Sequence, residues 1–273
     1  MSFKRNNVQE FIEAKCGCSD LTKWGSYQHN LAQLNLTSQD IALLNNLRKL
    51  DAISYWLKGL YSYSQGLHGI HRGFSAWSIV KLYYSIFYSL RCELLLNSYI
   101  LVRNGAIFKL NISTDTQFSK YNAGKIRGDH QLTIKLYSDL VANGDISDVI
   151  SSNTIEGDSP YTWMLKQRER VNYHMQNFPD PDIDPLFVKT VEAIHDSKLE
   201  ELLSQVITSA DNVMLFDIDY SMVAIPSYKL KLLHNELVAQ GCDLSLKHIE
   251  LTHIKSILQS VGLSNSFCDS LTR

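Results

Sequence analysis

Arg168 and His174 are the two residues of this 273-residue chain whose types and spacing best suit a chemical reaction. A histidine exchanges protons near neutral pH. An arginine binds phosphate through paired N–H donors and offsets negative charge that develops in a transition state. An Arg and a His together are the minimum set for cleaving a phosphodiester without a metal ion. The chemistry that these two residue types could supply is therefore metal-independent cleavage of a phosphodiester.

A helix over residues 159–174 is expected to carry this pair. Asp158 or Ser159 can cap its first free N–H groups, and Pro160 suits its first turn. Arg168 falls within an apolar stripe, where a Leu would be expected, and Asn172 follows it one turn later. A guanidinium in such a position is costly unless it is paired or used. The apolar residues of the stripe are Tyr161, Met164, Leu165, Val171 and Met175.

The expected helical geometry separates the two polar groups. At about 100° per residue, Arg170 and His174 lie about 40° apart on the face opposite the stripe. Arg168 and His174 lie about 120° apart, so they can border one cleft only at its edges or across a dimer axis. Spacing alone leaves open that Arg168 pairs with a buried carboxylate or a helix C-terminus, and that His174 is a surface residue.

Helical periodicity dominates the first half of the chain. Residues 37–40 are typical of an N-cap, and the apolar spacing that begins at Ile41 predicts a helix of about six turns, ending near residues 62–66. The glycine-rich residues 66–73 predict an irregular connection. A second helix, over residues 76–97, is apolar nearly all the way round, which is typical of a helix surrounded by others.

The middle of the chain combines one hairpin with further helix. Asn104-Gly105 lies between two apolar runs and predicts a β-hairpin over residues 99–110. A helix is expected over about 129–141, and the Pro/Asp-rich residues 179–185 are the best candidate for a domain boundary.

Beyond that boundary, helices are expected over residues 186–206, 226–239 and 244–261, with short extended pieces at 213–216 and 221–225. The fold class is therefore mostly α, a helical bundle with a small β-hairpin insertion and a C-terminal helical extension. The expected segments are an N-terminal segment (1–36), the bundle (37–182) and a C-terminal helical region (183–273).

Composition narrows the class of protein. A net charge of −2 excludes a chain-wide nucleic-acid footprint, so any RNA contact must come from a local basic patch. Five scattered cysteines favour reduced thiols in a cytoplasm. The N-terminus has no secretory signal, and charges interrupt the most apolar run, over residues 77–96, so neither secretion nor a membrane span is expected. A cytoplasmic protein is expected.

The aromatic segment WSIVKLYYSIFY (residues 77–88) and the later helix with Arg168 and His174 resemble the HEPN superfamily of helical domains. In that family an Arg, a polar residue and a His four to six residues later form a metal-independent ribonuclease site, usually at a dimer interface. Here Glu169 follows the Arg, where the family more often has Asn, Asp or His. Five residues intervene before His174, whereas Arg170 has only three. The resemblance covers about residues 40–178.

The resemblance implies a toxin or antiphage-defence ribonuclease that acts on RNA as a homodimer, without cofactor or metal, alone or with a protein partner such as an antitoxin or defence subunit. His174 would then be the general acid or base and Arg168 the phosphate clamp, while Lys166, Arg170 and Asn172 bind or orient the substrate. Many domains of this kind have lost catalysis, so a non-catalytic binding or scaffold module in a larger complex is the alternative. A third hypothesis is a metalloenzyme that binds its metal ion through His68 and His71.

Overall fold

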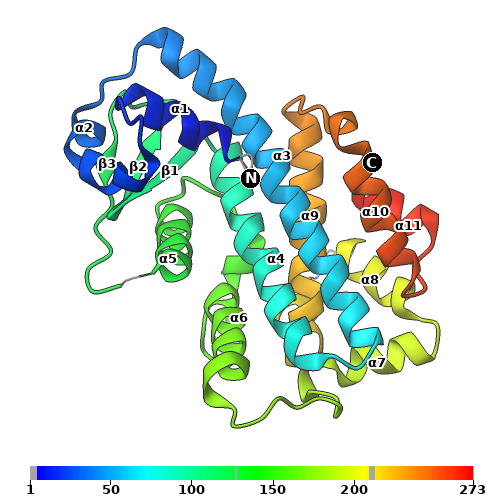
Figure 1. Cartoon of the computed structure of the whole chain (residues 1–273). Helices are drawn as coiled ribbons and strands as arrows, with labels where there is room; N and C mark the ends of the chain where they lie inside the picture. Colours follow the sequence, from blue (N-terminus) through cyan, green and yellow to red (C-terminus); the bar gives the residue numbers. More distant parts are fainter. Residues whose placement is uncertain (1–4, 127, 209–212, 273) are drawn as a thin grey trace.

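A mostly helical architecture with a small antiparallel sheet is seen in the computed structural model, which describes residues 5–126, 128–208 and 213–272 (Figure 1). The mostly α prediction is therefore confirmed. The α-helices of the described residues are α1 (Asn7–Lys15), α2 (Gln28–Gln33), α3 (Ser38–His71), α4 (Ser75–Leu96), α5 (Asp129–Ala142), α6 (Pro160–Glu169), α7 (Val188–His195), α8 (Leu199–Thr208), α9 (Ile218–Ala239), α10 (His248–Gln259) and α11 (Asn265–Thr272). The strands are β1 (Tyr99–Asn104), β2 (Ala106–Asn111) and β3 (Ser119–Lys120).

The long helix α3 begins as the sequence predicts but ends later. Thr37 and Asp40 cap each other's backbone N–H groups in a capping box. The predicted connection at residues 66–73 is wrong, because α3 continues to His71. Its glycines serve close packing: a Cβ on Gly66 would lie 2.8 Å from Cγ of Leu82 on α4. A side chain there would push the two helices apart.

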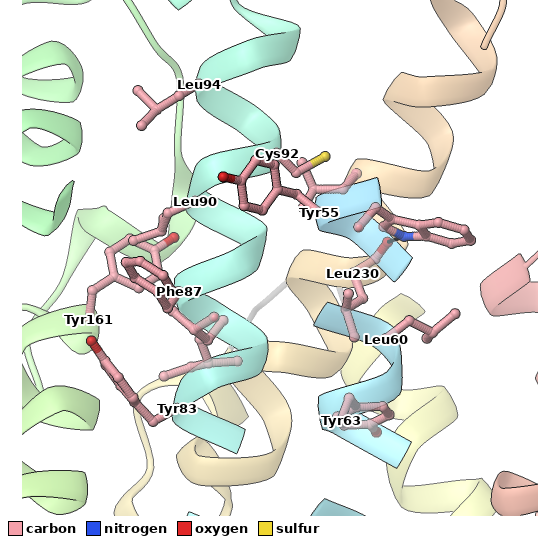
Figure 2. Packing of buried hydrophobic residues seen from close by; sticks show 14 of the residues in the cluster. Tyr55, Leu60, Tyr63, Tyr83, Phe87, Leu90, Cys92, Leu94, Tyr161 and Leu230 are labelled. Carbon is pink, nitrogen blue, oxygen red and sulfur yellow. Dashed lines mark hydrogen bonds between the residues drawn. The ribbon is translucent and has the colours of Figure 1, made fainter. Parts of the chain in front are cut away.

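Helix α4 is surrounded by other elements, as its all-round apolar surface predicts. It packs against α3 and α9 on one side and against α5 and α6 on the other. Figure 2 shows Leu60 and Tyr63 on α3, whereas Tyr83 points from α4 away from α3. Apolar core therefore covers both sides of α4, and the candidate site lies on the side that faces α5 and α6.

The β-hairpin forms where the Asn-Gly signal predicts it. Strands β1 and β2 pair antiparallel around Gly105, whose φ of +65° is the left-handed conformation that favours glycine. Strand β3 pairs with β2 and completes a sheet of order β1-β2-β3. This sheet lies beside α1 and α2, at one end of the molecule (Figure 1).

The second half of the chain departs from the prediction at residues 213–226. The expected extended pieces are wrong: residues 213–215 form a 3₁₀ turn, and α9 runs from Ile218 with Pro226 inside it. Asp217 caps this helix by accepting a hydrogen bond from the backbone N–H of Asp219. The run Met222, Val223, Ala224 and Ile225 is buried all round. A short run buried on every side has no visible helical period.

A buried ion cluster ties α9 to α4. Lys229 of α9 is 1% exposed, and its Nζ lies 2.5 Å from Oε2 of Glu93 and 3.1 Å from Oδ1 of Asp148. Tyr137 donates to Glu93 at 2.6 Å, and Tyr161 donates to Asp148 at 2.7 Å. We call these five residues the Lys229 cluster. Its hydrogen bonds join α4, α5, α6 and α9 beside the candidate site.

The expected C-terminal region packs on the first part of the chain, since α9 contacts both α3 and α4 and Trp56 donates to the carbonyl oxygen of Leu230 at 3.3 Å. The segment boundaries after residues 36 and 182 stay predictions. None of the described helices has the length and apolar character needed to cross a membrane.

Candidate functional site

Helix α6 starts as the sequence predicts. Ser159 is the N-cap and accepts a hydrogen bond from the backbone N–H of Thr162 at 3.4 Å, and Pro160 occupies the first turn. The predicted apolar stripe is buried through most of its length, at Tyr161, Met164, Leu165 and Val171. The helix is thus pinned against the core, which fixes the direction of its last turn.

The chain changes helix type between Arg168 and His174. Helix α6 ends at Glu169, and Arg170–His174 forms a π-helical turn, closed by a hydrogen bond from the N–H of Met175 to the carbonyl oxygen of Arg170 at 3.0 Å. The expected angles of about 100° per residue therefore do not apply beyond Glu169. Single π-helical turns are rare and occur frequently at functional sites.

Arg168 is half-buried in the last turn of α6 and has no acidic partner among the described residues. Its guanidinium carbon lies 5.3 Å from the centre of the Tyr173 ring. Its Nε is buried and makes no hydrogen bond within the described part of the chain. The alternative in which a carboxylate neutralises this arginine is not seen in the described ranges.

A histidine from another helix lies in the same region. The Tyr83 hydroxyl of α4 and Nδ1 of His130 on α5 are 2.8 Å apart. The His130 ring stacks on Phe87, with ring centres 4.2 Å apart, and Tyr84 meets it edge-on. The half-buried imidazole is therefore held in a fixed orientation by three aromatic residues.

Electrostatic effects connect His130 and Tyr83 with the end of α6. Burial lowers the pKa of His130 and Arg168 lowers it further, while Asp129 and Glu169 oppose the shift. Burial raises the pKa of Tyr83, and Arg168 acts in the opposite direction. We call Tyr83, His130, Arg168 and Glu169 the Arg168 cluster. A neutral imidazole beside a guanidinium can accept a proton near pH 7 while the cation holds an anion.

His174, the sequence candidate for proton transfer, is exposed at the end of the π-helical turn. An apolar surface lies on the neighbouring segments. Trp77 at the start of α4 is 56% exposed and contacts the exposed ring of Phe178, with centres 6.1 Å apart. Phe74 and Ile183 are also exposed. We call Phe74, Trp77, Phe178 and Ile183 the Trp77 patch.

Arg170 forms an ion pair with Asp184. Its Nη2 donates to Oδ2 of Asp184 at 2.8 Å, and its Nε donates to Gln167 at 2.9 Å. Asp184 is 1% exposed and also accepts a hydrogen bond from the backbone N–H of Leu186. This pair fastens residues 180–187 to the π-helical turn.

The two other candidate substrate-binding residues lie on the same element. Lys166 is exposed and pairs with Asp158, with Nζ 2.7 Å from Oδ2. Asn172 is half-buried within the π-helical turn. Arg168, Arg170, Asn172 and His174 are thus brought within two consecutive turns, whereas Lys166 faces the surface beside the start of α6.

The metalloenzyme hypothesis rests on His68 and His71, which the structure places on a helix. His68 and His71 lie in the last turns of α3, and Nδ1 of His68 is 3.1 Å from Oγ of Ser260. Within the described ranges, no group of three or more His, Cys, Asp or Glu side chains is placed to hold a metal ion.

His130 and Tyr83 do not stand out in the sequence as members of the site. The residues are 47 positions apart, and no local pattern joins them. One signal was present: the aromatic segment of α4 contains Tyr83, Tyr84 and Phe87 together, and a helix that presents three rings to one neighbour favours a planar side chain opposite them.

Comparison of the chain with protein-family models, with curated proteins and with solved structures finds no match.

Proposed function

We propose that this protein is a HEPN-like endoribonuclease that needs no metal ion, with Arg168 as its phosphate-binding group. The observation that carries the proposal is the guanidinium of Arg168, half-buried, with a buried Nε that has no hydrogen-bond partner in the described part of the chain. A buried donor left unpaired costs stability, about 1–3 kcal/mol. A site that must receive an anion accounts for such a cost.

The proposed reaction uses the ribose itself as the nucleophile. An imidazole accepts the proton of the 2′-hydroxyl, and the 2′-oxygen forms a bond to phosphorus while the bond to the 5′-oxygen breaks. The leaving 5′-oxygen takes a proton from an imidazolium, which gives a 2′,3′-cyclic phosphate and a 5′-hydroxyl end. Arg168 binds the non-bridging oxygens, where negative charge develops.

Two histidines are candidates for proton transfer. His174 lies on the turn that follows Arg168, and His130 lies within the electrostatic reach of that arginine. The lowered pKa of His130 suits a base that must be neutral near pH 7. His174 suits an acid or base that acts at an open surface, because it is exposed.

The proposal includes a homodimer. The Trp77 patch is apolar, exposed and joined to the π-helical turn through the Arg170–Asp184 pair. Trp77 and Phe178 are in contact, and exposed apolar side chains that lie together are typical of interaction sites. A second copy on this patch would bring two π-helical turns together and place an exposed His174 near the Arg168 cluster of the other protomer.

Cleavage of a labelled RNA in the presence of EDTA tests the proposal. We expect the parent to release a product that ends in a 2′,3′-cyclic phosphate, and a DNA of the same sequence to stay intact. Arg168→Ala should lower the rate by about 10²–10³-fold, the usual effect of removing a group that stabilises transition-state charge. His174→Ala and His130→Phe then identify the proton carrier.

Matched controls are available on the surface of the described structure. Arg103→Ala on β1 and His29→Ala on α2 remove exposed residues of the same types and should leave the rate unchanged. If Arg168→Ala cleaves RNA as fast as Arg103→Ala, or if the parent leaves the RNA intact, the ribonuclease proposal fails.

A second function, a non-catalytic binding or scaffold module, is favoured by one observation. The Tyr173 ring covers the guanidinium of Arg168 at 5.3 Å and so partly compensates its charge inside the protein. This module would show no cleavage by the parent, while substitution of Trp77 by Ser would release a bound protein partner such as an antitoxin or a defence subunit.

A further inference from the structure

One stripe of α4 reaches the surface between otherwise buried turns. Over residues 79–96, every residue of the helix outside this stripe is buried. The stripe alternates cations with aromatic rings at the helical spacing of three and four residues. We call it the α4 stripe, and its partly exposed members are Lys81, Tyr84, Tyr88 and Arg91.

The rings of the α4 stripe continue the Arg168 cluster. His130 of α5 meets Tyr84 edge-on, with ring centres 5.4 Å apart, and the centre of Tyr84 lies 5.9 Å from that of Tyr88. The Tyr88 ring in turn lies 6.4 Å from Tyr55 of α3. A continuous row of aromatic rings therefore leads from His130, beside the proposed phosphate-binding arginine, across α4 to α3.

Two lysines beside this row have no carboxylate partner. Lys58 of α3 is exposed, and its Nζ lies 5.9 Å from the centre of the Tyr88 ring. Lys81 is partly exposed, and neither lysine forms an ion pair within the described part of the chain. Arg91 differs, because its Nη1 lies 3.9 Å from Oδ1 of Asp129. The unmatched positive charge of this surface is therefore that of Lys58 and Lys81.

We propose that the α4 stripe and Lys58 bind a single strand of RNA, with bases on Tyr84 and Tyr88 and phosphates at the two lysines. Proteins that bind single strands combine cations that follow the backbone with aromatic rings on which bases stack. The inference deepens the proposed function and rests on it for its purpose, because the strand held here would continue to Arg168.

The spacing of the two tyrosines favours an unpaired strand. Tyr84 and Tyr88 are four residues apart on one helix, about 6 Å along its axis. Neighbouring bases in a duplex are only about 3.4 Å apart. Two neighbouring bases that each contact one of these rings must therefore unstack from one another, which a paired strand resists.

Binding of a labelled RNA with 2′-O-methyl riboses tests the inference. This RNA lacks the free 2′-hydroxyl, so the proposed reaction cannot cleave it. Fluorescence anisotropy of the full chain, with EDTA present, should show that the single strand binds about tenfold more tightly than its duplex.

Variants of the two tyrosines test the stacking. Tyr88→Leu and Tyr84→Leu should each weaken binding of the single strand about tenfold, whereas Tyr88→Phe keeps the ring and should bind as the parent does. Tyr27→Leu is the matched control, since Tyr27 is also partly exposed and stacks on Trp24. Urea denaturation shows whether each variant is folded.

The salt dependence of binding separates phosphate contacts from stacking. Each phosphate contact on a single strand contributes about 0.7 to the slope of log K against the logarithm of the salt concentration. Lys58→Ala and Lys81→Ala should each reduce the slope by about that amount, and Tyr88→Leu should leave it unchanged. Lys189→Ala, at an exposed ion pair on α7, is the control.

The inference is overturned if the folded Tyr84 and Tyr88 variants bind the single strand as tightly as Tyr27→Leu, or if duplex and single strand bind equally well. Unchanged salt slopes in both Lys58→Ala and Lys81→Ala overturn it too. If binding follows the expectations but the parent leaves ordinary RNA intact, the α4 stripe is supported and the ribonuclease proposal alone fails.

Discussion

Two buried cations in this protein have opposite surroundings. Lys229 is fully enclosed and pairs with two carboxylates. Tyr161 donates to the other oxygen of Asp148, and Tyr137 donates to the same Oε2 of Glu93 that Lys229 contacts. Arg168 is half-buried, has no carboxylate partner in the described ranges and keeps a buried Nε without a hydrogen bond. The two cations share a helix, because α6 contributes Tyr161 to the Lys229 cluster and also carries Arg168. The two side chains thus differ in whether the protein itself supplies the opposite charge.

Electrostatics express the same difference. Burial opposes the charge of Lys229, yet Glu93 and Asp148 raise its pKa above the ordinary value. Arg168 instead acts on its neighbours, because it lowers the pKa values of His130 and Tyr83. The charge of Lys229 is neutralised by the two carboxylates of its own cluster. The charge of Arg168 instead changes the pKa values of two groups that can exchange protons, His130 and Tyr83.

The largest expected effect is on stability, at the Lys229 cluster. Lys229→Met leaves Glu93 and Asp148 buried without their cation and should lower the free energy of unfolding by about 3–5 kcal/mol. Urea denaturation measures the change, and Lys189→Met, at an exposed pair on α7, is the control. A loss below about 1 kcal/mol would mean that Lys229 contributes no more than a surface ion pair. The structural role given to Lys229 would then be wrong.

The Arg170–Asp184 pair should give an intermediate effect. Arg170→Ala leaves the carboxylate of Asp184 buried with only its backbone hydrogen bond, so the free energy of unfolding should fall by about 2 kcal/mol. Because this pair holds residues 180–187 against the π-helical turn, RNA cleavage should weaken as well. Arg103→Ala again serves as the control. Unchanged stability in Arg170→Ala would show that the pair does not fasten the segment.

Arg168→Ala should cost much less stability than Lys229→Met. The substitution removes the contact with the Tyr173 ring, worth about 0.5–1 kcal/mol at an exposed site. It also removes a buried donor that has no partner, which offsets part of that loss. Paired denaturation curves of Arg168→Ala and Lys229→Met compare the two cations directly. A loss as large as that of Lys229→Met would make Arg168 a structural residue.

The elements that local signals specify could be predicted from the sequence. Ser159 and Pro160 start α6 because capping and the missing proline N–H act within one turn. Asn104 and Gly105 give the hairpin because the turn needs a positive φ. The placement of Arg168 off the surface followed from its position in an apolar stripe.

The remaining features depend on contacts between distant residues. Gly66 is typical of a break in a helix, but here it makes room for Leu82 of α4, which no local pattern reveals. The cap at Asp217 is hard to recognise in the sequence because the apolar run after it has no visible helical period. Tyr83 and His130 are 47 positions apart, and Lys229 and Asp148 are 81 apart. The candidate site could thus be predicted on α6 and not on the helices that face it.

The smallest expected effect is a pH dependence that Arg168 imposes on His130. The pKa of His130 is lowered from its ordinary value of 6.5 in the folded protein, chiefly by burial and then by Arg168. As the pH falls below 6.5, the unfolded chain takes up a proton that the folded protein still refuses, so stability decreases. His234 contributes with the same sign, since its pKa is also lowered.

Arg168→Ala should therefore raise the pKa of His130 and reduce the loss of stability on acidification. An NMR titration of the His130 ring measures the first change, and urea denaturation on both sides of pH 6.5 measures the second. Lys166→Ala, on the same helix but paired with Asp158 at the surface, is the control that should leave both unchanged. If the pKa of His130 is the same in the parent and in Arg168→Ala, the arginine does not act on this imidazole. The cation would then have to work with His174 alone.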